Sequence, residues 1–262
     1  VKQGLNSGWI DVYENEGKTG GAYAWGAFDT HPYILTNYQG KVHDVFTIAH
    51  EMGHALHSYF SNHHQPFIYA GYKIFVAEVA STVNEALLME HLLAKSVNKQ
   101  EQLYLLNQYL EQFRTTVFRQ TMFAEFEKII HQEVENGGAL TWEWFSDQYR
   151  KLNQQYYGAE TIIDPEVALE WSRIPHFYSG FYVYKYATGY SAAIALSQQI
   201  LSKGEPAVSK YLEFLKSGDS DYPLNLLRKA GVDMESPAPV QDALQVFEKL
   251  LNQMVELTGA NV

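Results

Sequence analysis

Cysteine is absent from all 262 residues of the chain. Its absence excludes disulfide bonds, thiolate metal sites and a cysteine nucleophile. Any bound metal would therefore have to be held by histidine, aspartate or glutamate. The lack of disulfides also fits a reducing compartment, and we expect a cytoplasmic protein.

Long apolar runs and positive charge are also scarce. No uninterrupted apolar stretch reaches the roughly 18 residues needed to span a bilayer, and no signal-peptide pattern is found, so we expect no membrane partner. Lysine and arginine number 19 against 30 acidic residues, which gives a formal net charge of -11. This balance disfavours a nucleic-acid partner, because binding to phosphates needs a basic surface.

The residues that are present indicate a globular, mainly α protein. Hydrophobic residues make up 46% of the chain and aromatic residues 15%, which is enough for a substantial core. Only residues 9–39 show strand-like patterns, and the remainder follows helical spacing. We expect one domain over residues 1–262, with a small sheet before its first long helix. The expected strands are 9–13, 22–28 and 32–37. The expected helices are 45–60, 73–94, one or two over 101–137, 141–158, one from 164, one ending at 201 and shorter ones over 206–259.

The helix expected over residues 45–60 carries an H-E-x-x-H pattern. Asp44 could cap its start. His50 and His54 lie one turn apart on the same face, so they could hold one metal ion, and Glu51 lies beside them. Apolar residues cover nearly every face of this helix, which indicates burial, and buried imidazoles and carboxylates need partners.

The next helix, over residues 73–94, supplies the expected third ligand. Glu78 and Glu85 are seven residues apart and share nearly one face. Glu78 would complete a zinc site with His50 and His54, and Glu85 could hydrogen-bond one of the ligands. Three protein ligands leave a position for water, which is typical of a catalytic zinc site. Glu51 could take a proton from that water and pass it to the leaving amine of a peptide.

Tyrosines recur every four residues in a later stretch, at Tyr178, Tyr182, Tyr186 and Tyr190. If the stretch is helical, they form one stripe of phenols that could stabilise a developing oxyanion from the opposite wall of a cleft. The alternative is an aromatic core stripe.

Small residues around Gly21 and Ala22 leave the backbone of an early strand accessible. Such a strand could pair with an extended peptide, and we expect substrate contacts at Gly21, Ala22 and Tyr23. The alternative is an ordinary hairpin packed on the core.

These motifs, in this order, resemble the M3 metallopeptidases, specifically the bacterial oligoendopeptidase F branch. The resemblance rests on residues 20–23, 31–38, 44–57, 75–82, His176 and 181–189. It implies a mostly helical, zincin-like catalytic domain that binds one zinc ion and cleaves short oligopeptides. It also implies that the chain is the C-terminal catalytic portion of an enzyme whose N-terminal half, absent here, would be its partner.

The resemblance assigns site residues one by one. His50, His54 and Glu78 match the zinc ligands, and Glu51 matches the catalytic glutamate. His176, Tyr182 and Tyr190 are expected to contact the transition state, and Tyr178 and Tyr186 the substrate. Two other functions stay open: a zinc-stabilised scaffold without activity, and a metal-free helical interaction domain. A base at Glu51 argues against the scaffold, because a structural site needs none.

Overall fold

The computed structural model describes residues 1–260, which form two compact units. The first unit consists of Val1–Tyr109 and the chain from Gly189 onward, and the second unit is Leu110–Thr188. Each unit is described by itself. The mainly α fold class with a small sheet is confirmed, and the assignment of residues 1–262 to one catalytic domain stays a prediction.

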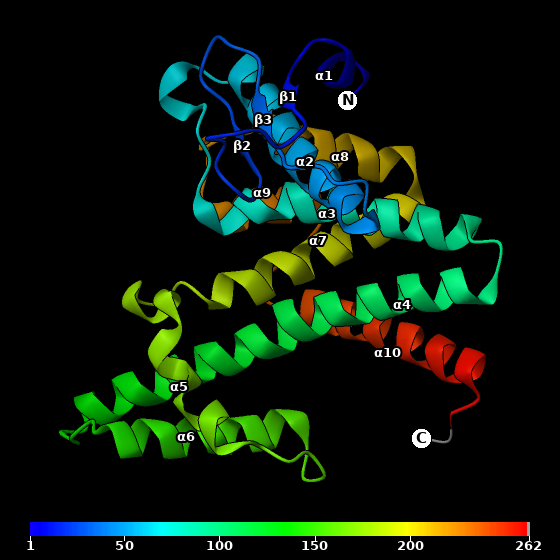
Figure 1. Ribbon diagram of the computed structural model, residues 1–262. Helices are drawn as coiled ribbons and strands as arrows, with labels where there is room; N and C mark the ends of the chain where they lie inside the picture. The colour runs from blue at the N-terminus through cyan, green and yellow to red at the C-terminus, as the bar shows by residue number, and fades with distance from the viewer. Residues whose placement is uncertain (261–262) are drawn as a thin grey trace. The chain divides into compact units, whose positions relative to one another are not determined.

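The first unit begins with a short helix and three short strands, followed by long helices (Figure 1). These are α1 (Lys2–Asn6), β1 (Ile10–Asp11), β2 (Tyr23–Trp25), β3 (Tyr33–Leu35), α2 (Val42–His64), a 3-10 turn (Phe67–Tyr69), α3 (Ile74–Lys95) and α4 (Lys99–Phe113), whose last residues belong to the second unit. Most of α7 (Tyr184–Lys203) follows, then α8 (Glu205–Lys216), α9 (Pro223–Ala230) and α10 (Ala238–Thr258). With 21 residues, α10 is longer than the short helices expected near the end of the chain.

The three strands form one sheet in the order β1-β3-β2. β1 runs parallel to β3, and β2 runs antiparallel to it with Ala24 opposite Ile34. Ile34 packs with Met52 and Ala55 of α2, and Ala24 adds to this cluster. Because side chains alternate along a strand, Tyr23 and Trp25 point to the other face, where both are exposed. β2 is an edge strand, with β3 on one side.

Helix α2 begins earlier and ends later than its sequence pattern predicts. It begins at Val42 rather than near Val45, so Asp44 lies in the first turn rather than at the N-cap. The Asp44 carboxylate accepts the backbone N–H groups of Lys41 and Gln39, both at 2.9 Å, and these bonds lower its pKa. At the other end, residues 61–64 continue the helix beyond its expected end at residue 60.

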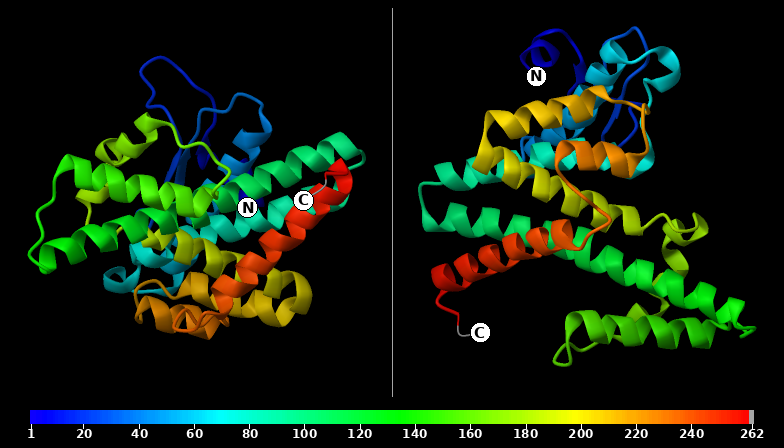
Figure 2. Two further views of the ribbon diagram at one scale, coloured as in Figure 1. Left: turned by 90° about the horizontal axis from the view of Figure 1, so that it is seen from below. Right: turned by 180° about the vertical axis from the view of Figure 1, so that it is seen from behind.

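The core of the first unit surrounds α3. Val76, Val79, Ala80 and Val83 are buried there with alanines and a leucine of α7 and with aromatic and leucine side chains of α8 and α9. Figure 2 shows α8 and α9 from behind. Neighbouring helices enclose α3 on most sides. Apolar residues therefore lie on most of its faces, and its sequence is only weakly amphipathic.

The second unit is built on α5 (Arg119–Glu135) and α6 (Trp142–Tyr157), which pack against each other. A π-helical turn, Arg114–Phe118, joins α4 to α5. The helix expected over 141–158 is confirmed: the Thr141 hydroxyl caps it by accepting the Trp144 N–H, and Gly158 ends it. Met122, Phe123, Phe126 and Tyr149 form the core of this pair with Leu152, Ile174 and Val183.

The segment after α6 differs from its expected helices. Residues Pro165–Arg173 and Pro175–Tyr178 form 3-10 helices, and regular α-helix resumes only at Tyr184. The four tyrosines from Tyr178 to Tyr190 therefore do not share one helical stripe, and that expectation is wrong. Pro165 and Pro175 are suited to helix starts, and the non-helical backbone over residues 179–183 breaks the four-residue period.

Among residues 1–260, no helix combines the length and the apolar character needed to cross a bilayer.

Candidate active site

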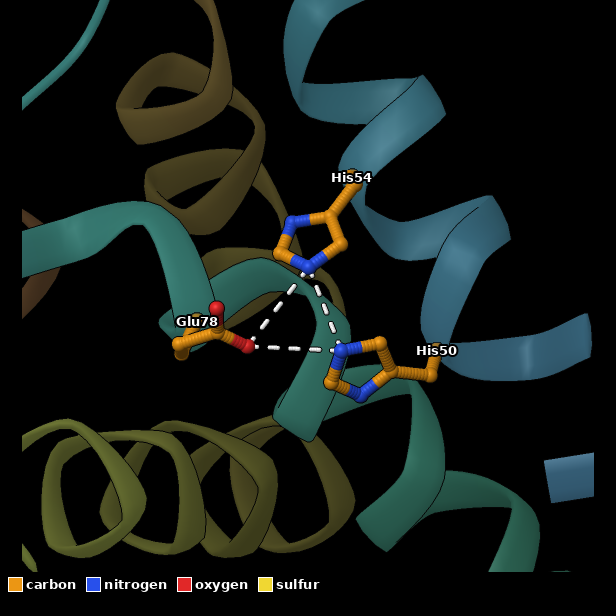
Figure 3. A group of neighbouring side chains, drawn as sticks. All are labelled: His50, His54 and Glu78. Atoms are coloured by element: carbon orange, nitrogen blue, oxygen red, sulfur yellow. Dashed lines mark hydrogen bonds and ion pairs between the residues drawn. The ribbon is translucent and has the colours of Figure 1, made fainter. Parts of the chain in front are cut away.

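The first unit brings together the three residues predicted to bind metal. His50 and His54 project from α2 and Glu78 projects from α3, and their donor atoms face one another (Figure 3). His50 Nε2 and His54 Nε2 are 3.2 Å apart, and Glu78 Oε2 lies 3.3 Å from the first and 3.5 Å from the second.

The spacing of these donors fits a metal ion. In a tetrahedral zinc site with bonds of about 2.0 to 2.1 Å, neighbouring donors are roughly 3.3 to 3.4 Å apart. The three distances in this chain lie close to that value, and the His/His/Glu donor set is one that suits zinc. The three side chains are half-buried, with between 17% and 38% of their surface exposed.

The contacts among these donor residues shift their pKa values. Burial would lower the pKa of His50, but hydrogen bonds to Glu78 and Glu85 outweigh it and raise that pKa to about 10. The same contacts with His50, and then with His54, hold the pKa of Glu78 far below its usual range. Metal binding would replace the proton shared in this cluster, because imidazole ligates only in its neutral form.

Glu85 contacts His50, one of the candidate metal ligands, as predicted. Its Oε1 accepts a hydrogen bond from His50 Nδ1 at 2.5 Å. Since Nδ1 is then the protonated nitrogen, Nε2 is left to point at Glu78 and His54. The carboxylate of Glu85 thus fixes both the orientation and the tautomer of His50.

Glu51 differs from its neighbours in being buried, with 6% of its surface exposed. This burial raises the pKa of its carboxyl group, whereas the nearby His50 and His54 lower it. A carboxylate with a raised pKa, next to this cluster of candidate metal ligands, has the affinity for a proton that a general base needs.

Two contributors to the site were missed from the sequence, Ser81 and Gly53. The Ser81 hydroxyl donates to the Glu78 carbonyl at 2.9 Å and lies 3.4 Å from Glu78 Oε2. Gly53 faces the same serine: a Cβ at Gly53 would come within 2.4 Å of Ser81 Cα. The i, i+3 spacing of Glu78 and Ser81 was a signal for the first, whereas the second depends on how two helices cross.

His57, one turn after His54, is not part of the donor cluster. It is fully buried, and its ring stacks on Tyr72 at 3.8 Å with an angle of 5° between the planes. Burial, with a smaller effect of His54, lowers its pKa to about 3, so His57 is a neutral core residue.

The second unit brings together three of the residues predicted to contact substrate. His176 Nε2 lies 3.1 Å from the Tyr186 hydroxyl, and its ring stacks on Tyr182 at 5.7 Å. Tyr182 and Tyr186 contact each other edge to face. Tyr178 is 87% exposed and stands apart from this cluster.

Tyr190 lies in the first unit and is buried on α7, where burial raises its pKa well above the usual value. Tyr186 and Tyr190 both lie on α7, one helical turn apart, whereas Tyr178 and Tyr182 precede that helix.

Gly21, Ala22 and Tyr23 lead into the edge strand β2. Gly21 has a positive φ of 86°, and the Asn37 side chain donates to its carbonyl at 2.8 Å. Gly21 and Ala22 line a hollow of about 380 Å³ together with Asn37, Lys41 and Thr47. A role for these residues in peptide binding stays a prediction.

The chain is similar to known proteins over nearly its whole length. Residues 1–246 match the family model described as Peptidase family M3. Oligopeptidase PepF of Bacillus subtilis (strain 168) is 56% identical over 257 residues, which cover 98% of this chain and 38% of that protein. The chromosomal oligoendopeptidase F of Lactococcus lactis subsp. cremoris is 46% identical over 262 residues, which cover the whole chain and 44% of that protein.

The chain is also similar to solved protein structures. A crystal structure from Chlamydophila abortus aligns with a TM-score of 0.91 and 48% identity over 98% of this chain and 43% of that one. Oligoendopeptidase-F from Enterococcus faecium aligns with a TM-score of 0.76 and 49% identity over 83% of this chain and 40% of that one. The chain thus spans less than half the length of the proteins that it matches. It belongs to peptidase family M3, in the oligoendopeptidase F branch that its motifs resemble.

Proposed function

We propose that this chain is the catalytic portion of a zinc metalloendopeptidase that hydrolyses peptide bonds in short oligopeptides. The observation that carries the proposal is the triangle of donor atoms from His50, His54 and Glu78, with the buried carboxylate of Glu51 beside it. Relatives named oligopeptidase and oligoendopeptidase support the same reaction and the same class of substrate.

Zinc held by these three residues would supply a Lewis acid that polarises the peptide carbonyl and makes a water molecule acidic near neutral pH. Glu85 keeps His50 Nε2 free to ligate by accepting the Nδ1 proton. Ser81 restrains Glu78 by donating to its backbone carbonyl, one turn of helix away.

Glu51 is the general base in this proposal. One of its carboxylate oxygens takes a proton from the attacking water, and the same group then delivers that proton to the nitrogen of the leaving amine. The raised pKa that burial causes makes the carboxylate a stronger base than an exposed glutamate.

His176, Tyr182 and Tyr190 are proposed to stabilise the oxyanion by donating hydrogen bonds, as the family resemblance suggests. The contact between His176 Nε2 and the Tyr186 hydroxyl supports a defined orientation for the imidazole. Tyr178 and Tyr186, with Gly21, Ala22 and Tyr23, are proposed to bind the substrate. The edge strand β2 supports the last three, because its free edge could pair with an extended peptide.

The direct test measures metal content and peptide cleavage together. We expect the dialysed chain to retain about one zinc ion, to cleave a quenched short peptide, and to lose cleavage when a chelator is added. Glu51→Gln should keep the metal and lower kcat at least about a thousandfold, because the amide cannot accept the proton. The exposed Glu16→Gln serves as the matched control and should change neither quantity.

Two results would contradict the proposal. Loss of zinc in Glu51→Gln would make Glu51 a ligand rather than a base. Tight zinc binding without any cleavage by the parent chain would favour the zinc-stabilised scaffold, and no zinc at all would favour the metal-free interaction domain.

A further inference from the structure

The backbone of Phe181 adopts a conformation that a phenylalanine rarely takes. Its φ is 55°, in the left-handed region, where the Cβ of an L-residue is crowded. Phe181 lies between the 3-10 helix Pro175–Tyr178 and α7, in the stretch 179–183 that has no regular structure. A residue held in such a conformation needs contacts from its surroundings that outweigh the strain.

Those contacts come from α5. The backbone N–H of Phe181 donates to Glu127 Oε1 at 2.7 Å. Glu127 is only 3% exposed, so this bond is made away from solvent. One turn further along α5, the ring of His131 packs on the ring of Phe181, with 4.6 Å between centroids. Helix α5 therefore binds both the backbone and the side chain of the strained residue.

The strained residue connects the two parts of the His176 cluster. His176 precedes it by five residues and Tyr182 follows it directly, and their rings stack 5.7 Å apart. The direction in which Tyr182 leaves the backbone depends on the φ of Phe181. The Tyr182 N–H also donates to the Ser179 carbonyl and closes a four-residue turn whose central residues are Gly180 and Phe181. That bond does not use the N–H of Phe181, which is left to donate to Glu127.

We propose that Glu127 is a positioning residue that fixes Phe181 in its left-handed conformation and thereby aligns Tyr182 with His176 for the substrate. This inference rests on the proposed function, in which His176 and Tyr182 contact the peptide. Nothing in that function uses Glu127 directly. Burying a carboxylate costs free energy unless the group is hydrogen-bonded. The bond from the Phe181 N–H offsets that cost, and it anchors the backbone between His176 and Tyr182.

The test compares three substitutions of Glu127 in the zinc-loaded chain. Glu127→Gln keeps an oxygen that can accept the Phe181 N–H. Glu127→Asp draws the oxygen back by one methylene, and Glu127→Leu removes it while filling the same space. Glu135→Leu, at the exposed end of the same helix, is the matched control. If Glu127→Leu does not fold, the aspartate variant carries the comparison.

Amide hydrogen exchange and peptide cleavage are the two measurements. In Glu127→Leu we expect the Phe181 amide to exchange at least about tenfold faster. We expect kcat to fall about ten- to a hundredfold with KM changed less than about threefold, because a misplaced donor is lost mainly in the transition state. Glu127→Gln should behave as the parent, Glu127→Asp should be intermediate, and zinc content should be the same throughout.

Three outcomes would overturn the proposal: unchanged exchange of the Phe181 amide in Glu127→Leu, faster exchange with unchanged kcat, or equal damage by glutamine and leucine. If the zinc-loaded parent cleaves nothing, the proposed function fails separately. The positioning role is then decided by the NMR signal of the His176 ring, which should shift in Glu127→Leu and not in Glu135→Leu. An unshifted signal would refute it.

Discussion

Gly53 lies directly against Ser81 where α2 crosses α3. A Cβ at Gly53 would be 2.4 Å from Ser81 Cα and 2.7 Å from the Ala80 carbonyl oxygen, both of them backbone atoms that cannot turn aside. The absence of a side chain at Gly53 therefore lets the two helices approach closely. That approach brings Glu78 within 3.5 Å of both histidines.

We predict that Gly53→Ala weakens zinc binding about ten- to a hundredfold, because α3 must move away and carry Glu78 with it. The affinity can be measured by competition with a chromogenic chelator. Gly71→Ala is the control, since a Cβ there meets nothing within 4 Å. Equal affinity in both variants would show that the crossing does not set the donor spacing.

Glu85→Gln should also weaken zinc binding, by about tenfold or more. The amide is neutral and can present its NH₂ group to His50 Nδ1, so the tautomer with Nε2 free is no longer favoured. The zinc affinity of this variant is compared with that of Glu90→Gln on the same helix, which we expect to match the parent. An unaltered affinity in Glu85→Gln would mean that His50 is oriented by its packing instead.

Because His57 is buried, we predict that the free energy of unfolding depends on pH in a specific way. Its folded-state pKa is lowered by burial to about 3, whereas the unfolded chain protonates it near 6.5. Between these values the unfolded state binds the additional proton, so stability decreases as the pH falls through this window. At pH 5 the loss relative to neutral pH is about 2 kcal/mol. His57→Phe should abolish this part of the dependence, because phenylalanine keeps the stacking on Tyr72 and cannot be protonated.

The measurement is urea unfolding at pH 7.5 and pH 5, with chelator present so that metal release adds no pH dependence of its own. His63→Phe, at an exposed position of the same helix, should retain the dependence of the parent. A parent and a His57→Phe variant with the same decrease would contradict the burial argument.

The chain aligns with less than half of the length of each of the two relatives, and this leads to another prediction. The chain spans 38% of the Bacillus subtilis oligopeptidase and 44% of that of Lactococcus lactis, so for the proposed peptidase we expect further substrate contacts from outside the matched region. We expect zinc affinity close to that of the full-length Bacillus subtilis protein, and kcat/KM for a quenched peptide at least about tenfold lower. The matching 257-residue portion of that protein, made by itself, is the control and should be equally slow. Equal turnover by the short and full-length proteins would refute the expectation.

The pairing of the candidate ligands within each helix was predictable because it is local. His50 and His54 are one helical turn apart, and Glu78 and Glu85 share a face of the next helix, so helical periodicity alone aligns each pair. The tyrosine stripe was not predictable in the same way. Its four-residue period implies a helix, but Pro175 and the non-helical backbone at Phe181 interrupt it, and only Tyr186 and Tyr190 lie on α7.

The ends of α2 show a further limit of sequence reasoning. Asp44 was expected at the N-cap, where aspartate is common, yet it serves equally well at the third position of the helix. The helix was expected to end at residue 60, but Ser61 is fully buried and its hydroxyl donates to the Ala70 carbonyl, so a tertiary contact accompanies the longer helix. Contacts between distant segments, as between Gly53 and Ser81, leave no periodic signal in the sequence.

The positions of the donors on α2 and α3 also bear on how this chain is held together. Two donors come from one helix and the third from its neighbour, 24 residues later in the chain than His54. An ion bound there would be a removable cross-link in a protein that has no cysteine to form a permanent one. Chelation would then remove the link between α2 and α3 as reduction breaks a disulfide. The free energy that holds the two helices together would increase with the concentration of free zinc.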